Sequence, residues 1–407
     1  MRYLLSFLLL CCCADTAFSQ AKSSLKDKRR SVEVPFEYYN NFILVKATFN
    51  GFLPLIFIFD TGAEYTILSK PEMARTIGLT YQKEFKIAGS DLSNLLTAYL
   101  CRNVRFDMTE KVNAYGQDIL VLADDYFKFD EYAGTTVHGI MSANIFSDYI
   151  IEINYHRSSL ILHERAWFKP DKGFSEINIE MFRNKPYYNT RLQVLRDTVV
   201  PVKLLIDTGA ALPLLLFSDS HPLLDAPPGA IASEIGIGLG GFLEGYAGRV
   251  FRMDLGPFAQ NNAISYFQKL DTLLNKPYLN KRNGLIGNGI LSRYIVILDY
   301  QSEKMWLKPL KSANRPFIFD RSGIHLIAAG SQLNRYYIQN IIARSPAERA
   351  GLLRGDQLLR VGWMPARFLA LDGLQMRFQR KPGTKLRIVV KRGEKRLKKK
   401  IILEEIL

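Results

Sequence analysis

The chain has 407 residues, of which 48% are hydrophobic, 12% aromatic and 23% charged, and its formal net charge is +15. This is the composition of a globular protein with material for two or three domains, and it excludes a disordered or fibrous chain. Beyond the N-terminal segment no apolar run approaches the ~18 residues that a membrane-spanning helix needs. We therefore expect no transmembrane segment in the mature chain.

The N-terminal stretch MRYLLSFLLLCCCADTAFSQ predicts a secretory signal peptide over residues 1–19. A basic Arg2 precedes an apolar run, and small residues follow at the expected cleavage point. A lipoprotein signal is the alternative, but Leu10 directly before Cys11 does not suit it. We therefore expect an exported protein. Whether the basic stretch AKSSLKDKRRSVE that follows is a propeptide or a disordered lead-in stays open.

The stretch FILVKATFNGFLPLIFIFDTGA, residues 42–63, has the pattern of a strand, a turn and a second strand that ends at Asp60. A carboxylate at the end of so apolar a strand is costly to bury unless another group offsets it. The sequence therefore predicts a partner for Asp60 elsewhere in the chain.

The same pattern returns at residues 187–210, YYNTRLQVLRDTVVPVKLLIDTGA, which ends at Asp207 and repeats the letters D-T-G-A. A second pair of segments follows the two motifs at nearly equal distances. HGIMSANIFSDYIIEINYHRSSLIL begins at His138, and NGLIGNGILSRYIVILDYQSEKMWL begins at Asn283. Agreement of motif, order and spacing indicates two copies of one structural unit.

The repeat predicts a first lobe over residues 32–169 and a second over residues 174–310, joined by polar, Pro-containing segments. Both lobes are rich in β-branched and aromatic residues with Gly and Asn turns between the runs. Short helices are expected only at PEMARTIGL and SANIFSDY. We therefore predict a mainly β protein in which two similar lobes are related by a pseudo-twofold axis.

Two acids in identical contexts, one from each lobe, predict a site between the lobes. Carboxylates about 3 Å apart cannot both ionise, so Asp60 and Asp207 would share one proton and supply an acid and a base together. Such a pair can activate a water against an amide. The residues that follow each acid are expected to support the pair, the glycines by allowing close approach and the threonines by hydrogen bonding; they are Thr61, Gly62, Thr208 and Gly209.

The two D-T-G-A turns, each followed by GIMS or GLIG, resemble those of the pepsin-like and retroviral aspartic proteases. Ala after the Gly is similar to the retroviral form, and two lobes in one chain resemble the pepsin arrangement. The resemblance implies two β-barrel lobes over roughly residues 32–310 and an aspartic endopeptidase acting on polypeptides without cofactor or metal. Leu285-Ile286-Gly287 matches the family's supporting segment, whereas Ser142 departs from it at the corresponding Gly.

Two alternatives to an active protease are kept. A single D-T-G triplet often marks only a turn after a strand, although two copies with matching flanks make chance a poor account. The more specific alternative to an active protease is a catalytically silent scaffold protein that binds peptides in the same cleft. Such a protein need not retain both acids and both threonines, so their presence favours hydrolysis.

The stretch GIGLGGFLEG, residues 236–245, contains a formal G-x-G-x-x-G, but the strand-like sequence after it excludes a dinucleotide loop. A hairpin over the cleft fits better and resembles the family's flap, although an ordinary Gly-rich β-turn looks the same. In lobe one the corresponding segment would lie near residues 88–90. The candidate flap residues are Gly89, Gly238, Gly240 and Gly241.

Residues 320–405 resemble a PDZ domain of the bacterial type, on the motifs S-P-A-x-x-A-G-L, G-D-x-L and P-G-x-x-L-x-[IV]. Ser345 is the expected N-cap of a short helix with Pro346 at its first position. The resemblance implies a carboxylate-binding loop for peptide C-termini at Gly323, Ile324, His325 and Leu326. A PDZ fold that only packs on the protease is the alternative. The PDZ type and the signal together favour a bacterial periplasm, cell envelope or extracellular location.

Other chemistries find little support. The run KLRIVVKRGEKRLKKKIIL is strongly basic, but it alternates like a hairpin with one solvated face and carries no aromatic residues for stacking on bases. We therefore expect no nucleic-acid partner. The five histidines show no metal-ligand spacing, and no serine-protease motif is present.

Overall fold

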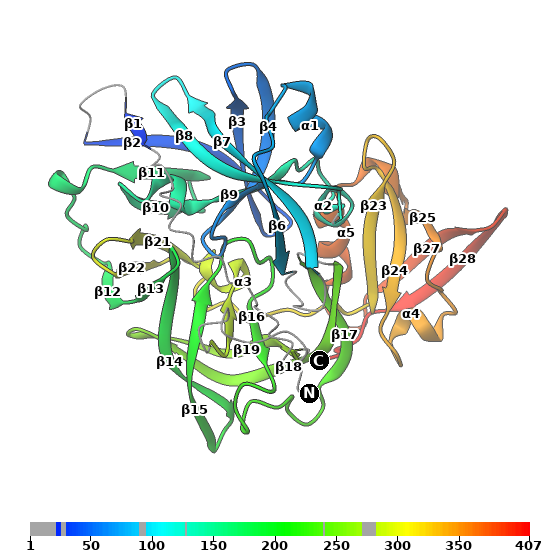
Figure 1. The fold of residues 1–407 in the computed structure, drawn as a ribbon. Helices are drawn as coiled ribbons and strands as arrows, with labels where there is room; N and C mark the ends of the chain where they lie inside the picture. The colour runs from blue at the N-terminus through cyan, green and yellow to red at the C-terminus, as the bar shows by residue number, and fades with distance from the viewer. Residues whose placement is uncertain (1–21, 26–29, 89–94, 127, 239–240, 271–281) are drawn as a thin grey trace, which may run out of the picture.

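A computed structural model describes residues 22–25, 30–88, 95–126, 128–238, 241–270 and 282–407. The predicted signal peptide, residues 1–19, and the candidate flap residues Gly89 and Gly240 lie outside these ranges. The described chain is mainly β and has three parts. In Figure 1, lobe one is blue to cyan, lobe two is green to yellow below it, and the C-terminal part is orange to red beside both lobes.

Lobe one is built around a closed ring of strands in the order β3-β4-β9-β5-β8-β7, which the pairing of β3 with β7 completes. Strand β6 extends the ring as a hairpin with β7, and the short β1 pairs with β8. The strands are β1 (Lys22–Leu25), β3 (Phe42–Phe49), β4 (Leu53–Asp60), β5 (Thr66–Leu68), β6 (Lys83–Ala88), β7 (Leu95–Thr109), β8 (Val112–Leu122) and β9 (Gly139–Ser142).

Lobe two repeats this topology strand for strand. Its ring has the order β14-β15-β20-β16-β19-β18 and is closed by the pairing of β14 with β18, while β17 extends it as a hairpin and β13 pairs with β14. The strands are β13 (Glu180–Phe182), β14 (Lys185–Leu195), β15 (Thr198–Ile206), β16 (Leu214–Phe217), β17 (Ile231–Gly238), β18 (Gly241–Leu255), β19 (Phe258–Gln268) and β20 (Gly284–Ile286). The predicted mainly β fold of two similar lobes is confirmed.

The two lobes share a central sheet in the order β12-β22-β21-β10-β11-β2. Its middle pair joins the repeated segments of the two lobes, with Ile153 of β10 opposite Val296 of β21 in an antiparallel register. The lobes are therefore connected by backbone hydrogen bonds as well as by side chains. The strands are β2 (Ser31–Tyr39), β10 (Ile150–Asn154), β11 (Ser159–His163), β12 (Ser175–Asn178), β21 (Tyr294–Asp299) and β22 (Lys304–Pro309).

Helices in the lobes are short. The two that the sequence predicts are present as α1 (Pro71–Thr76) and the 3₁₀ turn η1 (Ala143–Phe146). The others are α2 (Phe129–Ala133), η2 (Arg165–Trp167) and α3 (Asn288–Leu291). No helix within the described ranges is long and apolar enough to cross a membrane.

One hydrophobic core runs through both rings and the central sheet, because the strands alternate apolar side chains toward the inside of each ring. Its largest fully buried side chains include Phe57, Phe59, Phe146 and Tyr294. A separate core fills the C-terminal part.

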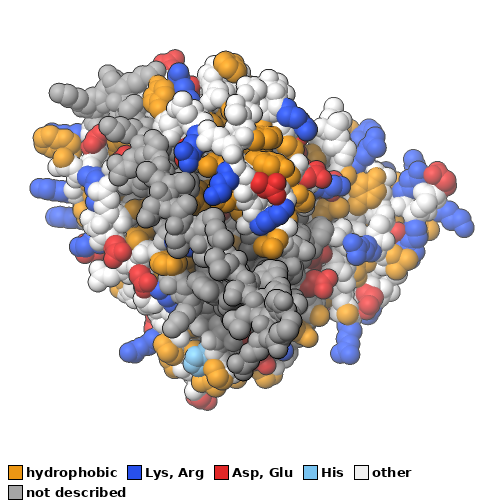
Figure 2. Space-filling view, viewed as in Figure 1, with side chains coloured by type: hydrophobic (Ala, Val, Ile, Leu, Met, Phe, Trp, Pro, Cys, Tyr) orange, Lys and Arg blue, Asp and Glu red, His pale blue; other side chains and the backbone are white. Residues whose placement is uncertain are grey.

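The C-terminal part contains a sheet in the order β23-β24-β25-β27-β28, in which β23 is an edge strand. The predicted closing hairpin is present as β27 and β28, and Figure 2 shows its Lys and Arg side chains at the end farthest from the lobes. Ser345 caps α4 as predicted, since its hydroxyl accepts from the Glu348 amide at 3.3 Å. The elements are β23 (Ile324–Ala329), β24 (Arg335–Ile341), α4 (Pro346–Arg349), β25 (Gln357–Val361), β26 (Met364–Pro365), η4 (Ala366–Phe368), α5 (Leu371–Phe378), β27 (Lys385–Arg392) and β28 (Lys395–Ile402).

The C-terminal part docks on lobe one through β23 and α5. Helix α2 of lobe one lies against β23, and Figure 1 shows it beside α5 on the side of β23 that faces the lobes. The Leu371 amide donates to the Tyr39 hydroxyl at 3.0 Å. Gly134 packs so closely on Leu371 that an added Cβ would lie 2.8 Å from the Leu371 Cβ. The edge of β23 is therefore covered by lobe one.

Candidate active site between the lobes

The two D-T-G-A turns meet between the lobes. Asp60 ends β4 and Asp207 directly follows β15, and their carboxyls lie within hydrogen-bonding reach of each other. Each carboxyl packs on the glycine of the opposite turn. A Cβ added to Gly209 would lie 2.4 Å from the Asp60 Cγ, and one added to Gly62 would lie 2.7 Å from the Asp207 Cγ. Only glycine therefore allows this approach at either position.

Local hydrogen bonds orient each carboxyl. The Gly62 amide donates to Asp60 Oδ1 at 2.6 Å, and the Gly209 amide donates to Asp207 Oδ1 at 2.9 Å. These two bonds are related by the repeat, so both acids are held in the same way at the ends of equivalent strands.

The two threonines lock the turns together across the lobe interface. The amide of Thr61 donates to the hydroxyl of Thr208, and the amide of Thr208 donates to the hydroxyl of Thr61, both at 3.0 Å. Each hydroxyl in turn donates to a backbone carbonyl of the other lobe, Thr61 to Ile206 at 2.7 Å and Thr208 to Phe59 at 2.9 Å. Both side chains are buried. All four polar groups are thus satisfied without water.

Strands β9 and β20 support the two turns, each running parallel to the strand that carries the acid. In lobe two this support requires Gly287, because an added Cβ would lie 2.2 Å from the Leu212 carbonyl oxygen. In lobe one the equivalent Ser142 is accommodated. Its hydroxyl donates to the Ala63 carbonyl at 2.7 Å, and its amide donates to the Thr66 hydroxyl at 3.1 Å. Ser142 departs from the repeat, but its hydroxyl and its amide therefore both have hydrogen-bond partners.

Asn288 is a further supporting residue that the sequence did not single out. Its buried side-chain amide donates to the Thr208 carbonyl at 2.6 Å and to the Asn41 carbonyl at 2.8 Å, and its oxygen accepts from the Tyr155 hydroxyl at 2.7 Å. It thereby ties the acid turn of lobe two to lobe one. The repeat places Ala143 at the equivalent position, and this polar-for-apolar difference is the one sequence signal that could have identified it.

The pair lies in a cleft with a volume of about 500 Å³ between the lobes. Lobe one contributes an apolar wall that includes Phe42, Ile67, Leu120, Phe129, Tyr132 and Ile140. Lobe two contributes an apolar wall that includes Leu205, Leu215, Phe217, Ile235, Leu243 and Leu285. Three cations, Arg183, Lys185 and Arg282, line the cleft with lobe two.

The environment favours one shared proton. Burial, and next the negative charge of Asp207, raise the pKa of Asp60 well above its ordinary value. Burial also raises the pKa of Asp207, while the positive charge of Arg282 acts in the opposite direction. Burial therefore favours a proton on the pair, and the positive charge of Arg282 favours the ionised form of Asp207.

Both Gly-containing hairpins border this cleft. Residues Lys86, Ile87 and Leu95 from the β6–β7 hairpin and residues Ile235, Gly236 and Leu243 from the β17–β18 hairpin line it. In the second hairpin Gly238 pairs with Gly241 at the ends of the two strands. The two hairpins occupy equivalent positions in the two ring topologies, as the repeat predicts.

The candidate carboxylate loop of the C-terminal part lies at the start of β23. Its Gly323 amide donates to Asp320 Oδ1 at 2.5 Å, and the Ile324 amide donates to the Ser322 hydroxyl at 3.1 Å. Leu326 points into the core of this part, whereas His325 lies on the other face of the strand. The Gly323 and Ile324 amides thus already have partners within the chain, and Ile324, His325 and Leu326 also pair with β24.

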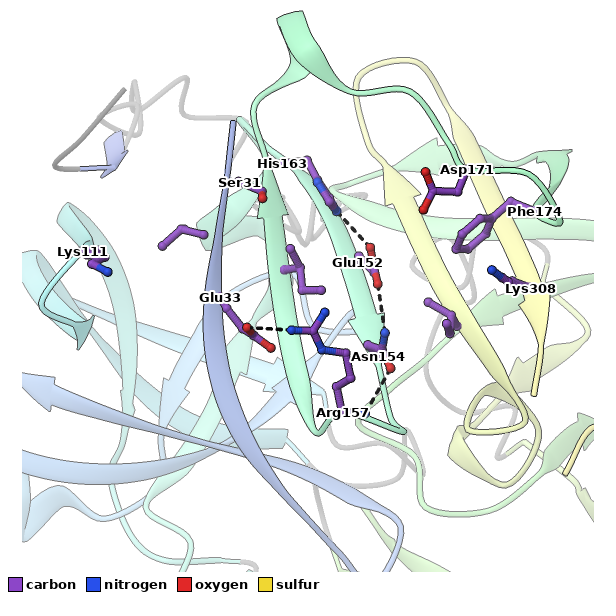
Figure 3. A pocket seen from close by; sticks show the side chains of 13 residues that line it. Ser31, Glu33, Lys111, Glu152, Asn154, Arg157, His163, Asp171, Phe174 and Lys308 are labelled. Atoms are coloured by element: carbon purple, nitrogen blue, oxygen red, sulfur yellow. Dashed lines mark hydrogen bonds and ion pairs between the residues drawn. The ribbon is translucent and has the colours of Figure 1, made fainter. Parts of the chain in front are cut away.

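A second cavity, of about 620 Å³, lies on the outer face of the central sheet (Figure 3). Its main charged side chains pair with one another. His163 contacts Glu152 at 3.0 Å, and Arg157 contacts Glu33 at 3.1 Å. This cavity holds no pair of acids comparable to Asp60 and Asp207.

Comparisons with known proteins identify a domain in the C-terminal part. Residues 337–392 match the family model of the PDZ domain, so the C-terminal part contains a PDZ domain. No curated protein matches the chain. Among the solved structures that are similar is the aspartic proteinase from Irpex lacteus. It is 11% identical, with a TM-score of 0.43, and the match covers 70% of this chain and 99% of that chain.

The fold and the site together define a class: a mainly β protein of two repeated lobes, with a pair of partly buried carboxyls between them and a PDZ domain docked on lobe one.

Proposed function

We propose that the protein is an aspartic-type endopeptidase that hydrolyses peptide bonds between its two lobes. One observation carries the proposal: Asp60 and Asp207 approach within hydrogen-bonding reach in a cleft, each packed on the glycine of the opposite turn. Two carboxyls held this close and partly withdrawn from water are costly to folding, so a silent binding protein would have no reason to keep them.

In the proposed reaction Asp60 carries the shared proton and Asp207 is the base. Asp207 takes a proton from a water between the two carboxyls, and the water oxygen forms a bond to the carbonyl carbon of the substrate. Asp60 gives its proton to the carbonyl oxygen, which yields a neutral tetrahedral diol. The diol collapses as Asp207 passes its proton to the leaving amine, and a diol hydroxyl returns a proton to Asp60. The acid and base are thereby restored without a covalent intermediate.

The proposed substrates are polypeptides. The cleft has a volume of about 500 Å³ and mostly apolar walls, which suit apolar side chains on either side of a scissile bond. Residues 323–326 remain the candidate carboxylate loop of the PDZ domain, and a peptide could add to β23 there only if α2 left the edge that it covers. We further propose that the protein is exported from a bacterial cell, on the signal predicted over residues 1–19. Sequencing the N-terminus of the protein isolated from its native envelope tests that location.

The test of activity uses the mature protein with unfolded casein across pH, with and without pepstatin. We expect cleavage that pepstatin blocks, and we expect Asp60→Asn and Asp207→Asn each to reduce kcat by at least about 10³-fold while leaving the fold intact. Asp197→Asn is the matched control, because Asp197 lies on an exposed turn of lobe two. Cleavage by the Asp60→Asn protein at the parental rate would contradict the shared pair. A folded protein that cleaves no peptide at any pH would favour the binding-only alternative.

A further inference from the structure

The lobe-two side of the cleft holds an arginine that interacts with Asp60 and Asp207 through charge but makes no salt bridge with either acid. Arg282 lies just before β20 and lines the cleft with Asp60 and Asp207. Its Nε is buried and has no hydrogen-bond partner. The contact found for its guanidinium within the described ranges is with the Phe217 ring, at 5.4 Å from the centroid. A half-buried guanidinium whose buried Nε has no hydrogen-bonded anion is unusual, and it points to an anion that is absent from the free protein.

A second cation lies in the same part of the cleft. Lys185, at the start of β14, has a side chain only 15% exposed, and its Nζ is 3.9 Å from a Glu64 carboxylate oxygen. Arg183 lies at the same 3.9 Å distance from that oxygen. Burial lowers the pKa of Lys185, and Arg282 is near enough to lower it further, although Glu64 acts in the opposite direction. Glu64 thus has two cations beside it and is no counter-ion for Arg282.

The opposite side of the cleft differs in character. The lobe-one wall is built from the apolar side chains of a buried cluster that includes Ile67, Leu120 and Ile140, with Lys86 as the cation that lines the cleft from this lobe. The repeat therefore creates two similar lobes but an electrostatically asymmetric cleft. The lobe-one side can bury an apolar side chain, whereas the lobe-two side presents positive charge among apolar residues.

We propose that the lobe-two side of the cleft binds an acidic side chain of the substrate, Glu or Asp, next to the scissile bond, with Arg282 as its counter-ion and Lys185 as a second cation. A carboxylate can accept two parallel N–H bonds from a guanidinium, and this pairing is strongest where water is excluded. The lobe-one side takes an apolar residue. This substrate class rests on the proposed peptidase function.

The test uses peptides that the enzyme cleaves, with Glu, Gln or Lys placed in turn at each position flanking the scissile bond. We expect one position at which the Glu peptide has a kcat/KM at least about tenfold above that of the Gln peptide. Arg282→Gln should reduce this ratio to near one, and Arg282→Glu should invert it in favour of the Lys peptide. Arg191→Glu is the control for net charge, because Arg191 is an exposed residue of lobe two; it should leave the ratio unchanged.

The ratio of kcat/KM for the Glu peptide to that for the Gln peptide separates substrate binding by Arg282 from an effect of Arg282 on the acid pair alone. If Arg282→Gln slows the Glu and Gln peptides equally, or if no position favours Glu, the acidic-substrate proposal is wrong while the peptidase proposal stands. Binding supplies a readout that needs no catalysis. The Kd of labelled Glu and Gln peptides for the Asp60→Asn protein is measured by fluorescence anisotropy, with and without Arg282→Gln. Tighter binding of the Glu peptide that depends on Arg282 supports this proposal whatever the rate of cleavage, whereas the peptidase proposal is overturned only if the parental protein, with Asp60 intact, cleaves none of the peptides.

Discussion

Thr61 and Thr208 hold each other across the lobe interface, because the backbone amide of each donates to the side-chain hydroxyl of the other at 3.0 Å. The two lobes are joined most tightly at the point where their carboxyls meet. The geometry of the acid pair therefore depends on contacts that neither lobe could make alone.

Replacing Thr61 by Val should destabilise the protein and impair hydrolysis. The hydroxyl accepts from the Thr208 amide and donates to the Ile206 carbonyl, and valine would leave both groups buried without a partner. Each such group costs about 1–3 kcal/mol. Chemical denaturation measures the loss, and kcat should fall by about 10²-fold because the turns shift. Thr61→Ser keeps the hydroxyl and is the control; a Val variant as stable and active as the Ser variant would contradict this role.

Exchange of the residues at the supporting positions Ser142 and Gly287 should destabilise the protein by unequal amounts. Gly287→Ser places a Cβ 2.2 Å from the Leu212 carbonyl oxygen, so we expect a loss of about 3 kcal/mol or more in the free energy of unfolding. Ser142→Gly removes a hydroxyl that donates to Ala63 and adds backbone freedom, which together cost about 1–2 kcal/mol. Equal losses in the two variants would show that the lobes tolerate the change alike, against this expectation.

The pH profile of kcat/KM should move when Arg282 is replaced by Gln. The positive charge of Arg282 lowers the pKa of Asp207, so its removal raises that pKa. Because Asp207 must be ionised to act as the base, the acidic limb of the profile should then shift to higher pH. Arg191→Glu again serves as the control. An acidic limb that stays in place or moves to lower pH would show that Arg282 does not act on the pair.

Stability should depend on pH through His325. Burial lowers the pKa of His325 from 6.5 to about 4, so the folded protein keeps the imidazole neutral. The contribution of the neutral imidazole to the free energy of unfolding is fully present above pH 6.5. It is lost as the pH falls toward 4, because the unfolded chain binds the proton first. We expect a decrease on the order of 1–3 kcal/mol over this window that His325→Gln removes. The exposed His156, replaced by Gln, is the control; a decrease that persists in His325→Gln must arise elsewhere.

The sequence predicts the parts of the site that repeat. The acid turns at Asp60 and Asp207 and the segments behind them share letters and spacing, so one lobe serves as the template for the other. The roles of residues that differ between the repeats could not be predicted. Arg282 and Asn288 stand where lobe one has Val137 and Ala143, and their roles arise from distances to residues remote in the chain.

The docking of the PDZ domain on lobe one could not be predicted from the sequence either. The PDZ motifs are local, but the cover over β23 comes from α2, which lies about two hundred residues earlier in the chain. A local pattern cannot indicate which distant surface will pack on an edge strand, since that choice depends on the assembled shape of both parts.

Helix α2 contacts the PDZ domain at β23, while its residues Phe129 and Tyr132 line the cleft. The PDZ domain is anchored on its other sides as well, because Phe317, Phe319, Ile406 and Leu407 pack with the core of the lobes. A domain held at its entry, at its exit and along one edge cannot come apart from the rest without exposing apolar surface. Thermal unfolding of the described parts is therefore expected as a single cooperative calorimetric transition, in place of the separate melting typical of domains on flexible linkers.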